Sequence, residues 1–144
     1  MAYNTVSGNA LKDNDIVLYS QLKGSLTKYI VKNVNAKNTG AILIATTDNN
    51  GKRFHPSMIS VLISGANAIT VPATLSIGTN ASTYNDLLAS TVLTGLTGVQ
   101  NMTNYNLVAM INSVPVNTGI YLNVTAGSTA TVCNIDVAIF GDYE

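Results

Sequence analysis

Side chains able to act as acids, bases or nucleophiles are scarce in this sequence. It contains one histidine, His55, one cysteine, Cys133, and one glutamate, the terminal Glu144. General acid–base catalysis at neutral pH draws mainly on His, Glu, Asp, Lys or Cys held in a pocket with a shifted pKa. No Gly-x-Ser-x-Gly elbow and no His-Glu-x-x-His pair occurs. We therefore predict that the protein is not an enzyme and has no catalytic residues, and that His55 is an exposed or capping residue at a strand end.

The sequence also predicts no metal and no cofactor. A structural zinc site needs four thiolate or imidazole ligands, more than one Cys and one His supply. Phosphate-binding glycine patterns do not occur. Residues 48–51 (DNNG) begin like a calcium loop, but Lys52 stands at the fifth position and no bidentate Glu follows. Residues 13–15 (DND) could hold a cation, although a turn before a strand at Ile16 explains them equally well.

The basic residues are unevenly placed. All seven lie within the first 53 positions. Lys28 and Lys32 share a strand face because their spacing is even, and Lys52 is adjacent to Arg53. These four residues are our candidates for contact with an acidic partner surface, and solvated strand faces are the alternative explanation. With no Trp and only two Phe to stack bases, the chain is not expected to bind nucleic acid.

The overall composition suits a subunit better than a free monomer. Hydrophobic residues make up 47% of the chain and charged residues only 10%, against about 25% charged residues in typical soluble domains. Asn, Thr and Ser take the place of the missing charges. A formal net charge of zero leaves little electrostatic repulsion between copies. We therefore expect the faces of the domain to be covered by other protein.

The same sequence indicates where the protein is made. No apolar run approaches the roughly 18 residues of a membrane span, and residues 1–11 lack the basic start and apolar centre of a signal peptide. We expect no membrane partner, and synthesis in a reducing cytosol. There the single Cys133, which lies in an apolar register, is expected to be a small buried core residue.

Tyrosine is the main aromatic residue, with seven copies. A tyrosine on the polar face of a strand could anchor a subunit contact or stack on a sugar ring, and sheet-surface packing is the alternative. Tyr121 is the most suggestive, because it points opposite to Ile120 and Leu122. With Tyr105 and Tyr84 it forms our set of candidates for subunit contact.

Alternation of apolar and polar residues indicates β-strands. Residues 69–77 alternate in this way, and Pro72 predicts that this strand lies at an edge or breaks there. Residues 120–125 and 133–139 alternate on either side of a turn containing Gly127, which predicts a C-terminal hairpin. Further strands are predicted at residues 16–22, 28–32, 41–47, 58–63 and 107–111.

The connecting segments carry signals of their own. Residues 48–51 predict a hairpin turn with a positive φ at Gly51. Residues 41–45 are apolar on both faces, so this strand is either central in the core or covered by another subunit. Residues 83–89 give the only helical suggestion. Residues 90–106 predict a long connection between sheets.

These elements predict an all-β fold. Many short strands, at most one short helix and a long crossover are typical of an antiparallel β-sandwich of Greek-key or jelly-roll type. The early basic charge suggests a division into residues 1–55, an N-terminal arm or accessory β-hairpins, and residues 56–144, the β-sandwich. A single continuous domain over residues 1–144 is the alternative.

Parts of the second half resemble the small β-sandwich proteins of tailed-bacteriophage virions, especially capsid decoration (cement) proteins and related tail subunits. The segments concerned are residues 73–80 (ATLSIGTN), 84–86 (YND), 119–125 (GIYLNVT) and 136–143 (DVAIFGDY). The resemblance implies a non-enzymatic virion protein that binds the major capsid protein on the capsid exterior, as a homotrimer, after synthesis in the host cytoplasm. It assigns no functional residues. A tail or neck subunit and a carbohydrate- or receptor-binding module are the alternatives.

Overall fold

The computed structural model describes residues 26–107 and 113–144. Eight strands and no helix are found in these two ranges. The strands are β1 (Leu26–Asn35), β2 (Gly40–Thr46), β3 (Phe54–Ala66), β4 (Thr74–Gly78), β5 (Leu88–Val92), β6 (Met102–Asn106), β7 (Gly119–Ala126) and β8 (Cys133–Tyr143). The predicted strands at 16–22 and, apart from Leu107, at 107–111 lie outside the described residues.

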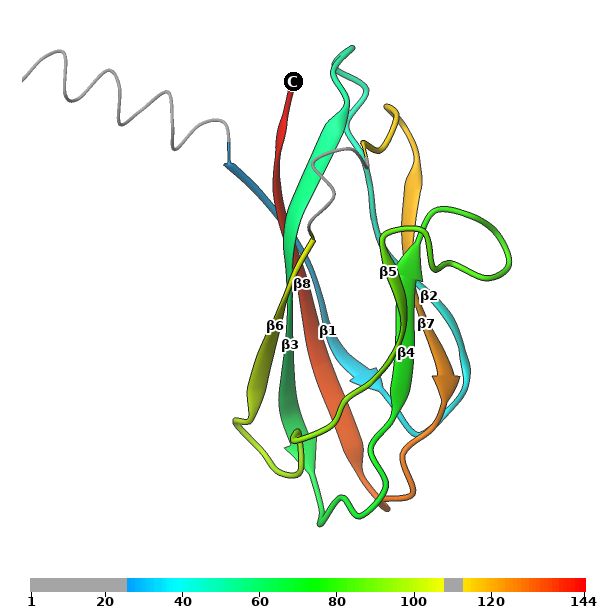
Figure 1. The fold of residues 1–144 in the computed structure, drawn as a ribbon, viewed down its shortest axis with the longest axis vertical. Coiled ribbons are helices and arrows are strands. Elements are labelled where there is room, and N and C mark those ends of the chain that lie inside the picture. Colours follow the sequence, from blue (N-terminus) through cyan, green and yellow to red (C-terminus); the bar gives the residue numbers. More distant parts are fainter. Residues whose placement is uncertain (1–25, 108–112) are drawn as a thin grey trace, which may run out of the picture.

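The strands form two four-stranded antiparallel sheets packed face to face (Figure 1). Sheet A has the order β1-β8-β3-β6, and sheet B has the order β2-β7-β4-β5. The first strand therefore neighbours the eighth, the second the seventh, the third the sixth and the fourth the fifth. This wrapped order is that of a jelly roll. The predicted antiparallel β-sandwich is confirmed.

The core lies between the sheets and follows the period-two patterns of the strands. In β7, Ile120, Leu122 and Val124 are buried and alternate with more exposed residues. In β8, Cys133 is only 1% exposed, which confirms its predicted burial. The largest fully buried side chains are Phe54, Ile59, Val61, Ile63, Leu75, Ile77, Leu93, Val114, Ile120, Leu122, Ile135 and Ile139.

Both predicted hairpins are wrong, because in each case the two strands joined by the turn lie in opposite sheets. The turn at residues 48–51 connects β2 of sheet B to β3 of sheet A, although Gly51 has the expected positive φ of 78°. The turn after β7 likewise leads to β8 in the other sheet. The neighbours of β2, β3, β7 and β8 within their sheets are strands distant in sequence, and local turn signals do not report on such partners.

The helix prediction at residues 83–89 is also wrong. This segment belongs to a loop that returns from β4 to β5, and β5 begins at Leu88. Asp86 accepts hydrogen bonds from the backbone N–H and the hydroxyl of Thr79, at 2.6 and 2.7 Å. Its carboxylate therefore closes the loop across its neck. The predicted connection over residues 90–106 does cross from sheet B to sheet A, but its ends belong to β5 and β6.

Strands β1 and β2 are integral to the two sheets. β1 pairs with β8 and β2 pairs with β7. Residues 26–55, which are the described part of the segment 1–55, therefore belong to the same sandwich as the rest. β2 is an edge strand, which excludes the central position considered for residues 41–45. The predicted break at Pro72 is confirmed, because β4 begins at Thr74.

Candidate protein-docking face

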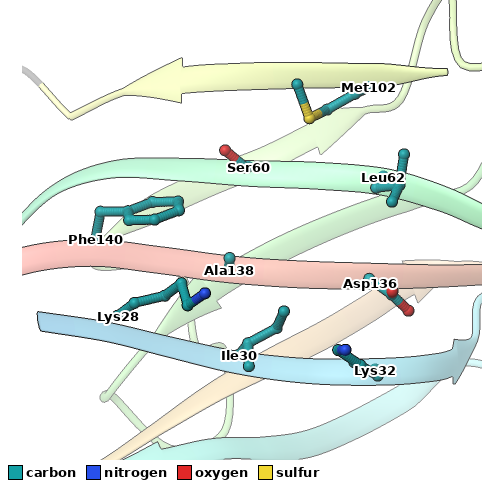
Figure 2. Close-up of a pocket in the computed structure, with 9 residues that line it drawn as sticks. All are labelled: Lys28, Ile30, Lys32, Ser60, Leu62, Met102, Asp136, Ala138 and Phe140. Carbon is teal, nitrogen blue, oxygen red and sulfur yellow. The ribbon is translucent and has the colours of Figure 1, made fainter. Parts of the chain in front are cut away.

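The outer face of sheet A brings together side chains from all four of its strands. Nine residues line a groove across this face (Figure 2): Lys28, Ile30, Lys32, Ser60, Leu62, Met102, Asp136, Ala138 and Phe140. They point outward because their chain neighbours, such as Val61 and Ile139, occupy the inward positions of the same strands. We call this surface the sheet A groove.

Side-chain size across the strands explains the hollow. In the middle of the face, Ile30 pairs with Ala138 and Ala138 pairs with Ser60, so small side chains form the floor. Phe140 rises on one side of this row and Leu62 on the other, as Figure 2 shows. The resulting groove has a volume of about 330 Å³. Its shape therefore follows from the small side chains of Ala138 and Ser60, with the larger Phe140 and Leu62 on either side.

Two of the apolar side chains that line the groove are exposed to solvent. The side chain of Met102 on β6 is 59% exposed and that of Ile30 on β1 is 41% exposed. Apolar side chains gathered in one hollow and rimmed by polar ones are typical of a protein-contact surface. The face is therefore suited to bury another apolar surface.

Two of the predicted contact residues lie on this face. Lys28 and Lys32 are both exposed on the outward side of β1, which confirms that they share a strand face. Asp136 lies beside Lys32 in the groove and accepts a hydrogen bond of 2.8 Å from the backbone N–H of Asn33. The β1 side of the groove is thus basic, with one carboxylate near Lys32.

The other two basic candidates, Lys52 and Arg53, lie outside the groove lining. Both belong to the connection between β2 and β3 and are exposed. The guanidinium of Arg53 donates to the hydroxyl and carbonyl oxygens of Ser113, at 2.6 and 3.0 Å. Its backbone also pairs with that of Glu144. Arg53 therefore has a structural role, whereas Lys52 is a plain surface residue.

Two of the three candidate tyrosines meet on the outer face of sheet B. The rings of Tyr84 and Tyr121 lie 4.7 Å apart with an interplanar angle of 34°. The carbonyl of Thr83 accepts hydrogen bonds from Ser76 and Asn123, which hold the loop against the sheet. Tyr105 lies elsewhere, on β6, where it packs against the core and burial raises its pKa.

The residues considered for chemistry are dispersed. Cys133 is buried in the core, and this burial raises the pKa of its thiol. His55 is half-buried on β3, near one end of sheet A. Within residues 26–107 and 113–144, no group of three or more His, Cys, Asp or Glu is placed to hold a metal ion. No helix in these ranges is long and apolar enough to cross a membrane.

The apolar members of the groove were not singled out from the sequence. Leu62, Met102 and Phe140 come from three different strands, and only the order of the strands in sheet A brings them together. A usable signal did exist in β8. Asp136, Ala138 and Phe140 occupy alternate positions of β8 and therefore point to the same outer face. Phe140 is a large apolar residue at a position where the pattern predicts exposure to solvent.

Comparison with known proteins gives similarity at the level of fold. No protein-family model and no curated protein sequence matches the chain. A chain in the "Acidic stable capsid structure of Helicobacter pylori bacteriophage KHP30" is 13% identical with a TM-score of 0.51, and the match covers 83% of this chain and 86% of that one. A chain in the "Capsid of Ralstonia phage GP4" is 13% identical with a TM-score of 0.52, covering 82% and 81%. The chain therefore shares its overall fold with components of two phage capsid structures.

Proposed function

We propose that this protein is a non-enzymatic structural component of a tailed-phage virion. Within that class we propose a decoration protein, which binds the major capsid protein on the capsid exterior and stabilises the shell. Both fold matches come from phage capsid structures. The observation that carries the docking part of the proposal is the sheet A groove, with the exposed apolar side chains Ile30 and Met102 and a basic β1 side.

The groove combines the two features that a reversible shell contact needs. Burial of Ile30, Leu62 and Met102 provides affinity through the hydrophobic effect. Lys28 and Lys32 provide orientation and a faster encounter with an acidic surface. We therefore propose that the outer face of sheet A contacts the shell and that Lys28 and Lys32 are its basic anchors. Lys52 and Arg53, outside the groove, are at most a secondary contact.

Binding to capsid shells tests this proposal. Shells assembled from the major capsid protein of the same genome are mixed with the purified protein, and the bound fraction is measured by co-sedimentation at physiological salt. We expect the double variant Lys28→Glu, Lys32→Glu to bind about tenfold or more weakly, since each reversal opposes an acidic partner surface.

A matched control separates docking from net charge. The double variant Lys37→Glu, Lys52→Glu changes the net charge equally and leaves the groove lining intact. We expect it to bind nearly as well as the unaltered protein. Equal binding by both double variants, or no binding of the unaltered protein, would refute docking through the sheet A groove.

Self-association belongs to the same proposal. A decoration protein that bridges neighbouring capsid subunits is expected to be a homotrimer, and a sandwich with net charge zero is a suitable subunit. A ring with more copies would favour the alternative of a tail or neck subunit. The alternative of a carbohydrate- or receptor-binding module is tested by a glycan array, on which binding would count against the decoration role.

A further inference from the structure

The four edge strands of the sandwich are not equally protected from pairing with another chain. An edge strand presents unpaired backbone N–H and C=O groups, and natural proteins protect such edges with charged residues, proline or very short strands. β5 and β6 are short, with five residues each, and β1 carries Lys28 and Lys32. β2 has seven residues (GAILIAT) with no charge and no proline. Among the described edge strands, β2 is therefore the longest one without a charged residue or a proline.

The first half of β2 is exposed to solvent. Gly40, Ala41, Ile42 and Leu43 are all exposed, with Leu43 47% and Ile42 36% exposed. These four residues pair regularly with β7 on one side, before a register shift between Leu43 and Ala45. No described strand pairs with β2 on its other side. Within the described residues, the first half of β2 is thus a regular, uncharged strand with one unpaired edge.

An apolar and aromatic patch continues from this edge over the outer face of sheet B. Leu43 lies opposite Tyr121 in the register of β2 and β7. The two side chains meet over Gly119, where an added Cβ would lie 2.9 Å from Cε2 of Tyr121 and 3.3 Å from Cδ1 of Leu43. Tyr84 then stacks on the far side of Tyr121. Leu43, Tyr121 and Tyr84 therefore form one surface, which we call the β2 patch.

Charge indicates what covers the β2 patch. None of the four strands of sheet B contains a charged residue. The strands of sheet A, in contrast, carry lysines and aspartates. Two copies of sheet B can approach without burying a charge and without charge repulsion, because its strands carry no charged side chain. A partner recognised through charge would instead select sheet A.

We propose that a second copy of this chain covers the β2 patch, with the free edge of β2 supplying backbone hydrogen bonds and Leu43 supplying the central apolar contact. The inference rests on the self-association part of the proposed function and goes beyond the proposed homotrimer, because contact between the same patch on two copies is two-fold symmetric and forms a dimer. The surface that a strand edge alone can bury is smaller than the roughly 800 Å² that each partner buries in a stable interface. The adjoining tyrosines extend the contact, which agrees with the enrichment of Tyr in interface cores.

Charge substitution at one position on each sheet tests the proposal. Leu43→Lys places a charge in the β2 patch, and Ile30→Lys places the same charge on the other sheet, at an edge-strand residue of similar exposure, 41%. The mass of the full chain is measured by light scattering on a sizing column over a range of concentrations. We expect the unaltered protein and Ile30→Lys to form the same oligomer, and Leu43→Lys to need at least tenfold higher concentration to assemble.

Site-directed cross-linking gives a second measurement that does not depend on weakening the contact. The native Cys133 is buried and 1% exposed, so a cysteine introduced at the surface is the reactive thiol. With a short bis-maleimide, we expect Leu43→Cys to give covalent dimers at low protein concentration and Ile30→Cys to give few.

The outcomes separate this inference from capsid docking. A dimer that depends on Leu43 supports it, whether or not the protein binds shells. Three results would overturn it: a monomer at all concentrations without cross-linking at Leu43, an oligomer lost in Ile30→Lys but not in Leu43→Lys, or equal cross-linking at both positions. Loss of shell binding in the Lys28 and Lys32 variant with intact oligomers would leave it standing.

Discussion

A hydrogen-bonded aromatic cluster joins the end of the chain to β1, and Tyr143→Phe tests its contribution to stability. The ring of Tyr143 packs against Phe54, with centroids 5.3 Å apart. Its hydroxyl is hydrogen-bonded to the hydroxyl of Tyr29 and accepts a bond of 2.7 Å from the backbone N–H of Asp48. Phenylalanine keeps the ring contact and removes both hydrogen bonds. The substitution therefore isolates the polar part of the cluster.

The expected loss follows from the number and exposure of these bonds. A hydrogen bond between neutral groups contributes about 0.5–1.5 kcal/mol to stability. Asp48 is exposed, so water can replace the bond to its N–H, whereas the hydroxyl of Tyr29 is half-buried. We expect Tyr143→Phe to lower the free energy of unfolding by about 1–2 kcal/mol. With an unfolding entropy of about 2.1 cal/mol/K per residue, the Tm of a chain of 144 residues falls by roughly 3–7 °C.

Urea and thermal unfolding, followed by circular dichroism, measure this loss. A double-mutant cycle with Tyr29→Phe isolates the bond between the two hydroxyls, and we expect a coupling energy of at least about 0.5 kcal/mol. The surface variant Tyr84→Phe serves as a control for hydroxyl removal. Full additivity of the two substitutions, or an unchanged Tm in Tyr143→Phe, would refute the stabilising role of the cluster.

Two further predictions concern the same region. Phe54 is fully buried and its ring lies 5.2 Å from that of Tyr29, so we expect Phe54→Ala to lower the free energy of unfolding by about 3–5 kcal/mol in urea titrations; a loss below about 1 kcal/mol would contradict that packing. Burial and the hydrogen bond to Tyr143 raise the pKa of Tyr29. In the unfolded chain the hydroxyl of Tyr29 ionises near its ordinary pKa of about 10, which is below its pKa in the folded state. The contribution of Tyr29 to stability is therefore complete below about pH 10 and is lost as the pH rises above it. Unfolding measured from pH 8 to 11 should show a shallower fall in Tyr29→Phe, and equal slopes would exclude the effect.

Local patterns in the sequence were sufficient for the strands and the orientation of their side chains. Alternation placed Ile120 and Leu122 inside and Tyr121 outside, and it placed Cys133 in the core, as the structure shows. The even spacing of Lys28 and Lys32 likewise put both on one face. These features are predictable because a strand turns successive side chains to opposite sides whatever its partners are.

The pairing of strands was not predictable from the same patterns. Turn residues at 48–51 and around Gly127 indicated hairpins, yet each turn passes between the two sheets. A turn signal reports that the chain reverses, and it does not report whether the next strand joins the same sheet. For residues 83–89, the hydrogen bonds of Asp86 to Thr79 form a loop instead of the suggested helix.

Alternation and composition thus determined an all-β chain with few charged residues and a formal net charge of zero, because both depend only on residue type and on the period of a strand. Tertiary structure alone decided which strands became edges and which residues became neighbours. It set Ala138 and Ser60 side by side as the floor of the sheet A groove, and it left β2 at an open edge with Leu43 beside Tyr121. Both candidate surfaces combine residues that are distant in sequence. They become neighbours only when strands pair within each sheet, and the order of that pairing is set by the packing of the whole sandwich.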